Sequence, residues 1–210
     1  MINPDTVKEF EKFTENYRVR WSYAGSILYG MCRERPRHDL KDVAASKLFL
    51  ISRGFFDADG RVSQIPEDEE FYYDVIAPVM QSEASRIDSY ISLLNEDCRK
   101  IKDSRTYILE AHKYLMDLFS DIKYFDNRML AARYLHFHCP KMVYLYSEKA
   151  DKRLSDMVSP EKEGDMPEKC DGIYAGFFDK LLELQTYLYE ETGIYRSPLD
   201  LDRFLTDRAH

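Results

Sequence analysis

The chain has 210 residues, 44% of them hydrophobic and 32% charged, with a formal net charge of −8 at pH 7. This length and composition indicate one globular domain and exclude an intrinsically disordered chain. The acidic balance lacks the basic field that draws proteins to nucleic acids or anionic membranes, and no apolar run approaches the roughly 20 residues of a membrane helix.

Helical spacing dominates the first quarter of the chain. Asn3 and the proline after it provide a helix start, and apolar residues then recur every three or four positions as far as a break at Pro36. A second helix is expected over 39–55. The run of aspartates and glycine at 56–60 is expected to form a turn after it.

The middle of the chain continues the helical pattern. Acidic residues at 67–70 mark the next helix start, and Pro78 is expected to kink or end that helix. Asp103 and Ser104 are candidate caps for the helix that follows them. Further helices are expected over 87–98, over 107–119, and over 127–146 with an interruption at Cys139 and Pro140.

The last quarter contains the clearest boundaries. The charged segment 159–171 has two prolines and a glycine and is expected to be a flexible loop. A helix is expected over 172–192, stopped by Gly193, and a short last helix starts where Ser197 precedes a proline. The whole pattern predicts an all-α fold, with residues 1–210 forming one irregular bundle of about seven to nine helices.

The cysteines and the N-terminus bear on the compartment. The four cysteines lie far apart and form no CxxC pair, which is typical of free thiols in a reducing compartment. The first residues are charged throughout and lack the apolar stretch of a signal peptide. We therefore expect a cytoplasmic protein.

The segment 128–140 concentrates two arginines, two histidines and a thiol. Arg133 and His136 are three residues apart, so on a helix they share a face that suits an anion. On a continuous helix His136 and His138 would diverge by about 200°, although both could turn to one ligand if the helix ended at Leu135. A helix end whose histidines complement the dipole explains the same residues. No zinc-type spacing accompanies them, so no metal is predicted.

Three arginines and a histidine lie close together at 33–38. Arg33 and His38 have the R-x4–6-H spacing of a class of helical ribonucleases, in which the arginine steadies the phosphate and the histidine handles the 2′-hydroxyl proton. The spacing is loose and Pro36 interrupts it. A solvated basic loop accounts for the same residues.

Lys47 and Arg53 lie on different faces of the second expected helix, where each could line a cleft between helices or extend its stem from the edge of the core. The stretches 45–55 and 132–140 resemble a group of uncharacterised bacterial all-helical proteins with a recurring K-Y-L-H-F-H-x-P segment. Arg133 stands where that group has lysine. The resemblance implies a bacterial source and a soluble helical fold, and it implies no activity.

We therefore predict a non-enzymatic binding protein with a cationic pocket for a phosphate-bearing or carboxylate ligand, nucleotides included. The predicted pocket residues are Lys47, Arg53, Arg133, His136 and His138. Two alternatives stay open. One is a metal-independent ribonuclease that uses Arg33 and His38 and would have nucleic acid as its partner; the other is a structural protein whose Tyr- and Phe-rich face binds a protein partner. No cofactor or membrane partner is predicted, and the sequence leaves the oligomeric state open.

Overall fold

The computed structural model describes residues 2–16, 23–54, 68–96, 100–120, 127–159 and 168–206. Over these residues the chain forms ten α-helices, one π-helical turn and one 3-10 turn, with no β-strand beyond an isolated bridge between Ile2 and Val158. The predicted all-α, single-domain bundle is thereby confirmed, and the helix number is close to the one expected.

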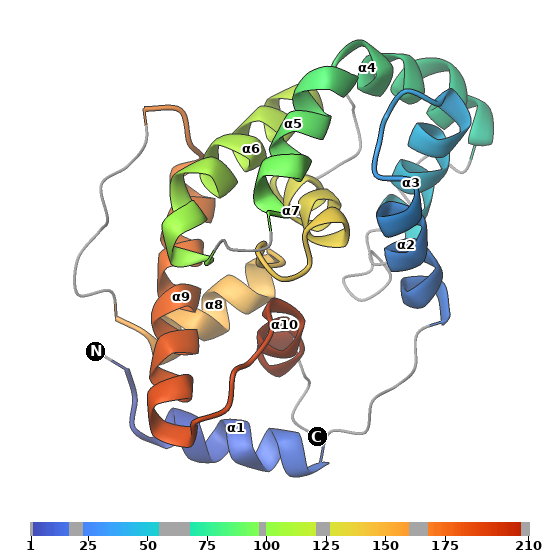
Figure 1. The fold of residues 1–210 in the computed structure, drawn as a ribbon. Helices are drawn as coiled ribbons and strands as arrows, with labels where there is room; N and C mark the ends of the chain where they lie inside the picture. The colour runs from blue at the N-terminus through green and yellow to red at the C-terminus, as the bar shows by residue number, and fades with distance from the viewer. Residues whose placement is uncertain are drawn as a thin grey trace.

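The first helices are α1 (Asp5–Asn16), α2 (Tyr23–Glu34), α3 (Lys41–Gly54), the π-helix η3 (Phe71–Ile76), α4 (Ala77–Ser82) and α5 (Ala84–Leu94). The remaining ones are the 3-10 turn η4 (Lys102–Ser104), α6 (Arg105–Leu118), α7 (Asn127–His138), α8 (Glu148–Met157), α9 (Gly172–Thr192) and α10 (Pro198–Thr206). At one end of the molecule lie α2, α3 and α4, and at the other lie α1, α8, α9 and α10 (Figure 1). Helices α5, α6 and α7 connect the two ends.

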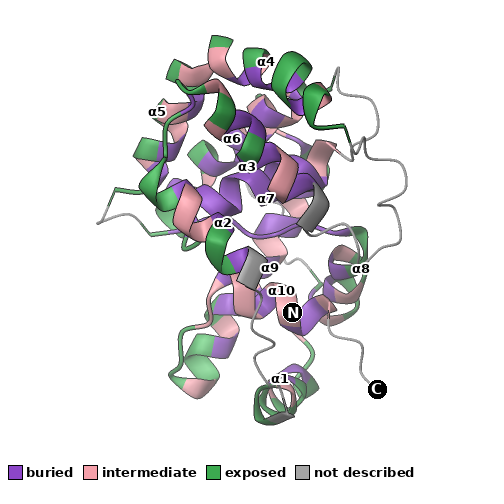
Figure 2. Ribbon diagram, turned by 90° about the vertical axis from the view of Figure 1, so that its right-hand side faces the viewer, coloured by how far each residue is buried: buried purple, intermediate pink, exposed green. Residues whose placement is uncertain are grey.

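Helix α7 is the central helix of the bundle. It packs against α2, α3 and α6, and every residue from Met129 to His138 is buried. A helix with no polar face fits this position, because no side of it meets water. The buried residues, coloured purple in Figure 2, accordingly concentrate around α7. The polar side chains of α7 must therefore find their partners inside the core.

Helix α9 has the predicted bounds and the predicted stop at Gly193, and local interactions determine both of its ends. The Asp171 side chain at the N-cap accepts a hydrogen bond from the Tyr174 amide, and Gly193 ends the helix in the left-handed region at φ 68°. Helix α10 starts with reciprocal capping, since the Ser197 hydroxyl accepts from the Asp200 amide while the Asp200 carboxylate accepts from the Ser197 amide.

A π-helical turn precedes α4, and Pro78 explains it. Proline lacks an amide hydrogen, and its ring would clash with the carbonyl four residues earlier, at Asp74. The chain widens just before this point, so that the Ala77 amide donates to the Tyr72 carbonyl five residues back. The sequence predicted a kink or an end at Pro78. In the structure a π-helical turn precedes Pro78, and the proline lies in the first turn of α4.

The structure differs from the sequence-based expectations at two helices. Helix α8 was not predicted. Ser104 occupies the N-cap of α6, but its side chain makes no capping hydrogen bond. The expected turn at 56–60 and most of the expected loop at 159–171, residues 160–167, lie outside the residues that the structure describes.

Candidate functional site

The two histidines of α7 that the sequence singled out face different partners. The His136 Nδ1–H donates to the Val143 carbonyl at 2.8 Å, and its Nε2 accepts from the Tyr29 hydroxyl at 2.7 Å. The His138 Nδ1–H donates instead to the Tyr134 carbonyl at 2.9 Å. Helix α7 continues through both residues, so the two rings diverge as a continuous helix requires.

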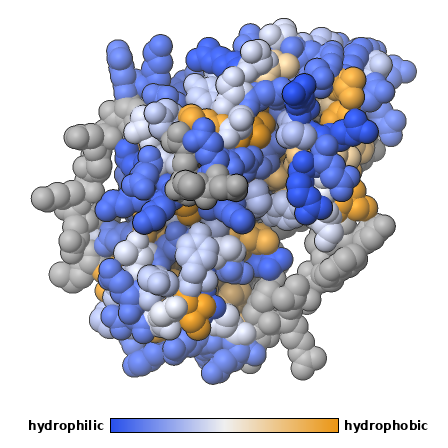
Figure 3. Space-filling view, viewed as in Figure 1, coloured by the Kyte–Doolittle hydropathy of each residue, from blue (hydrophilic) through white to orange (hydrophobic). Residues whose placement is uncertain are grey.

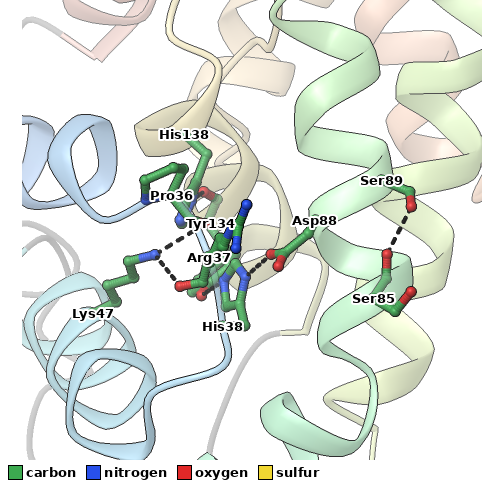
Figure 4. A network of polar contacts seen from close by, with 9 residues as sticks. All are labelled: Pro36, Arg37, His38, Lys47, Ser85, Asp88, Ser89, Tyr134 and His138. Carbon is green, nitrogen blue, oxygen red and sulfur yellow. Dashed lines mark hydrogen bonds and ion pairs between the residues drawn. The ribbon is translucent and has the colours of Figure 1, made fainter.

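A third buried imidazole, His38, belongs to a polar chain that crosses three elements (Figure 4). Its Nδ1–H donates to the Asp88 carboxylate on α5 at 2.5 Å, and its Nε2 accepts from the Tyr134 hydroxyl on α7 at 2.5 Å. The His138 ring lies beside it, with 5.3 Å between the ring centroids. Only Asp88, with a side chain 28% exposed, connects this chain of hydrogen bonds to solvent.

Lys47 enters the same region from α3 and is fully buried. Its ammonium donates to the carbonyls of Pro36 and Arg37, each at 3.3 Å, as Figure 4 shows. The lone pair of His138 Nε2 is buried and has no hydrogen-bond partner within the described part of the chain. Lys47, His38 and His138 thus form one buried cluster, which we call the Lys47 cluster.

Burial decides the charge of these imidazoles. It lowers the pKa of His38 to about 4 even though the Asp88 carboxylate acts in the opposite direction. It also lowers the pKa of His136 to about 4, and burial together with the Lys47 charge brings the pKa of His138 well below its usual value. All three rings are therefore neutral at pH 7. The His138 nitrogen left without a partner is an acceptor, so it does not attract an anion.

The structure separates two of the predicted pocket residues, the histidines of α7. The structure brings Lys47 and His138 into one cluster but gives His136 separate partners. Arg133 is buried within α7. The backbone of Arg53 lies in α3, and its side chain is outside what the structure describes. Periodicity placed α7 on a helix, although it expected helix as far as 146, and it did not reveal that α7 is enclosed on every side.

The residues of the ribonuclease alternative also lie in different surroundings. Arg33 is on the last turn of α2 with its side chain 80% exposed, beside Glu34. His38 lies in the irregular segment after α2 and is fully buried, with both ring nitrogens bonded. The geometry does not provide the shared groove in which an arginine and a histidine act on one phosphate.

The expected Tyr- and Phe-rich face is mostly interior. Among the largest fully buried side chains are Tyr72, Tyr134, Tyr144 and Tyr174. Phe10 of α1 packs against Phe204 of α10 with ring centroids 4.7 Å apart. The aromatic residues therefore build most of the core, and the exposed ones include Tyr107 on α6, Tyr189 on α9 and Tyr195 in the segment after α9.

The structure does contain a ligand-sized pocket, which the sequence reasoning missed. It has a volume of about 560 Å³ and lies between α3 and η3, beside Met31 of α2. Its apolar lining consists of Met31, Ala45, Phe49, Leu50, Tyr72 and Tyr73. Its polar lining consists of Ser46 and four carboxylates, those of Asp42, Glu69, Glu70 and Asp74. We call it the α3–η3 pocket.

The residues that line the α3–η3 pocket differ in solvent exposure from its floor to its rim. Ala45 and Tyr72 are buried and form its floor, whereas the four acidic residues are exposed and form its rim. Figure 3 shows apolar side chains among hydrophilic ones over the end of the molecule where α2, α3 and α4 lie. The acidic run at 67–70, followed by an aromatic triplet, is the only sequence signal of this pocket, and it was interpreted as a helix start.

Two thiols are buried and unreactive, and the described residues contain no metal cluster. Burial raises the pKa of Cys32 and Cys139 to about 12, so both thiols stay protonated and are poor nucleophiles. Within the described ranges, no group of three His, Cys, Asp or Glu side chains could hold a metal ion. No helix in those ranges is both long and apolar enough to cross a membrane.

Comparisons of the chain with models of protein families, with curated proteins and with solved structures find no match.

Proposed function

We propose that this protein is a non-enzymatic binding protein and that its ligand site is the α3–η3 pocket. The observation that supports this most strongly is the pocket itself. Its volume of about 560 Å³ is in the range of sites for small organic ligands. Apolar and aromatic side chains with a few polar groups at the rim are the usual lining of such sites.

The chemistry of the pocket supports binding rather than catalysis. Its described lining contains no histidine, lysine or cysteine, and its four carboxylates lie at the exposed rim, where water keeps them ordinary carboxylates rather than activated bases or nucleophiles. The groups with strongly lowered pKa values, Lys47 and the imidazoles of the Lys47 cluster, are sealed in the core. In addition, Cys32 and Cys139 are buried free thiols, which supports a cytoplasmic location.

Pocket-blocking variants test this function. We would screen a fragment library by ligand-observed NMR against the wild type, against Ser46→Trp, and against Ser92→Trp as a matched control. Ser46 is an exposed pocket residue on α3, and Ser92 is an exposed serine on α5 outside the pocket lining. Fragments are expected to bind the wild type and Ser92→Trp but not Ser46→Trp. Hits that bind all three alike, or no hits at all, would contradict the proposal.

A further inference from the structure

Acidic side chains predominate at the rim of the α3–η3 pocket. Asp42, Glu69, Glu70 and Asp74 line it, and no lysine or arginine does so within the described residues. Asp74 is paired with Lys41 at 3.1 Å, but the other three carboxylates form no ion pair in the described part of the chain. Like charges around a concave apolar surface concentrate cations there and repel anions.

The rim already binds an ammonium group that belongs to the chain. The Lys41 Nζ lies 3.8 Å from the centroid of the Tyr73 ring while it donates to the Asp74 carboxylate. An aromatic face beside a carboxylate is the combination that recognises organic cations in general. Tyr73 and Asp74 both line the pocket and already hold Lys41, so the ammonium of a ligand would lie against the three rim carboxylates that form no ion pair with the described residues.

The interior of the pocket suits an apolar body. The Tyr72 ring at its floor is fixed by an edge-on contact with Phe49 at 5.2 Å and by a hydrogen bond between its hydroxyl and Ser52 at 2.9 Å. Leu50 contributes an aliphatic wall, and Met31 adds an adaptable thioether. A volume of about 560 Å³ greatly exceeds what a bare metal ion occupies. The cation must therefore carry an organic body.

From these observations we infer that the ligand of the α3–η3 pocket is an organic cation, an amine or quaternary ammonium compound with an alkyl or aryl body. This inference rests on the proposed function and specifies its ligand class. The body packs on Tyr72 and Phe49, and the charged end lies among the carboxylates of the rim. The expectation of a phosphate-bearing or carboxylate ligand is reversed at this pocket, because its rim repels such groups.

The test compares three probes of nearly one body, 4-phenylbutylamine, 4-phenylbutanol and 4-phenylbutyrate, by NMR titration at pH 7 and low salt. We expect the amine to bind at least about tenfold more tightly than the alcohol, and the carboxylate to bind most weakly. Added salt at 0.5 M is expected to weaken the binding of the amine and to leave the affinity for the alcohol unchanged.

Paired variants assign the effect to the rim. The double variant Glu69→Gln with Glu70→Gln is expected to weaken the binding of the amine about three- to tenfold and to leave the affinity for the alcohol unchanged. The matched control, Glu190→Gln with Glu191→Gln, neutralises two adjacent exposed glutamates on α9. It is expected to change neither the affinity for the amine nor the affinity for the alcohol.

The outcomes separate the two proposals. If amine and alcohol bind equally, and Ser46→Trp abolishes both, the pocket binds ligands but the inferred charge preference is wrong. If the carboxylate binds most tightly, the inference is likewise wrong. If no probe binds the wild type at millimolar concentration, the apolar pocket does not act as a binding site and both proposals fail.

Discussion

Replacing Lys47 by methionine is predicted to stabilise the protein at neutral pH. Lys47 is fully buried, and its ammonium has two carbonyl partners at 3.3 Å but no ion pair with a carboxylate in the described part of the chain. Burial, the largest cause, lowers its pKa from 10.5 to about 8. Methionine retains the unbranched stem and removes the charge that burial disfavours.

The magnitude follows from that pKa change. A difference of about 2.5 units, at about 1.36 kcal/mol per unit, makes the charged form of Lys47 cost about 3 kcal/mol on folding. The variant loses two long hydrogen bonds to the carbonyls of Pro36 and Arg37, together worth about 1 kcal/mol. The net prediction at pH 7 is that Lys47→Met raises the free energy of unfolding by about 2 kcal/mol.

The effect of Lys47→Met on stability depends on pH. Between pH 8 and 10.5 the unfolded chain retains the Lys47 proton that the folded chain has lost. Rising pH therefore stabilises the wild type over this range, and the advantage of the variant disappears toward pH 10.5. The cost of burying the charged form of Lys47 is present in full only below pH 8.

Urea unfolding at pH 7 and at pH 10 measures both effects. The matched control is Lys8→Met on α1, where the side chain is 81% exposed and loss of the charge should change stability little. A Lys47→Met variant less stable than the wild type at pH 7 would refute the reasoning, because the ammonium contacts would then outweigh the cost of its burial.

Three further predictions concern stability. The pKa of His136 is about 4 in the folded chain and 6.5 for an exposed histidine, so the unfolded state binds more protons below pH 6.5. Between pH 7 and pH 5, urea unfolding should therefore show that this ring lowers the free energy of unfolding by about 2 kcal/mol. An unchanged free energy of unfolding would contradict the burial of His136 as a neutral group. Tyr29→Phe removes the donor to His136 Nε2 and should cost about 1–3 kcal/mol, with a cost near zero as the contrary result. Gly193→Ala should cost about 1 kcal/mol in thermal unfolding, since nothing lies near the added methyl and only the positive φ opposes it; an unchanged melting temperature would disprove this.

The sequence predicted the fold where the chemistry was local. Spacing and caps predicted both ends of α9 and the start of α10, because Gly193 and Ser197 determine the backbone around them. Helix α8 escaped prediction although Ser147 caps it. The π-helix at Phe71–Ile76 could not be predicted, because Pro78 is equally compatible with a kink, a helix end or a widened turn.

The site was harder to predict than the fold for a physical reason. Spacing correctly showed that His136 and His138 diverge on a continuous helix. It did not show that α7 is enclosed, and that enclosure makes the imidazoles neutral. The α3–η3 pocket depends on how two segments pack across a tertiary contact, which periodicity within each segment does not specify.

The most direct test of the central claim is to map where 4-phenylbutylamine binds, by methyl and amide NMR of the wild-type protein. We predict that the largest shifts occur at Met31, Ala45 and Leu50, which line the α3–η3 pocket, with small shifts at the Lys47 cluster. Shifts centred on α9 or on the histidines of α7, or no shifts at saturating probe, would contradict the assignment of the binding site to this pocket.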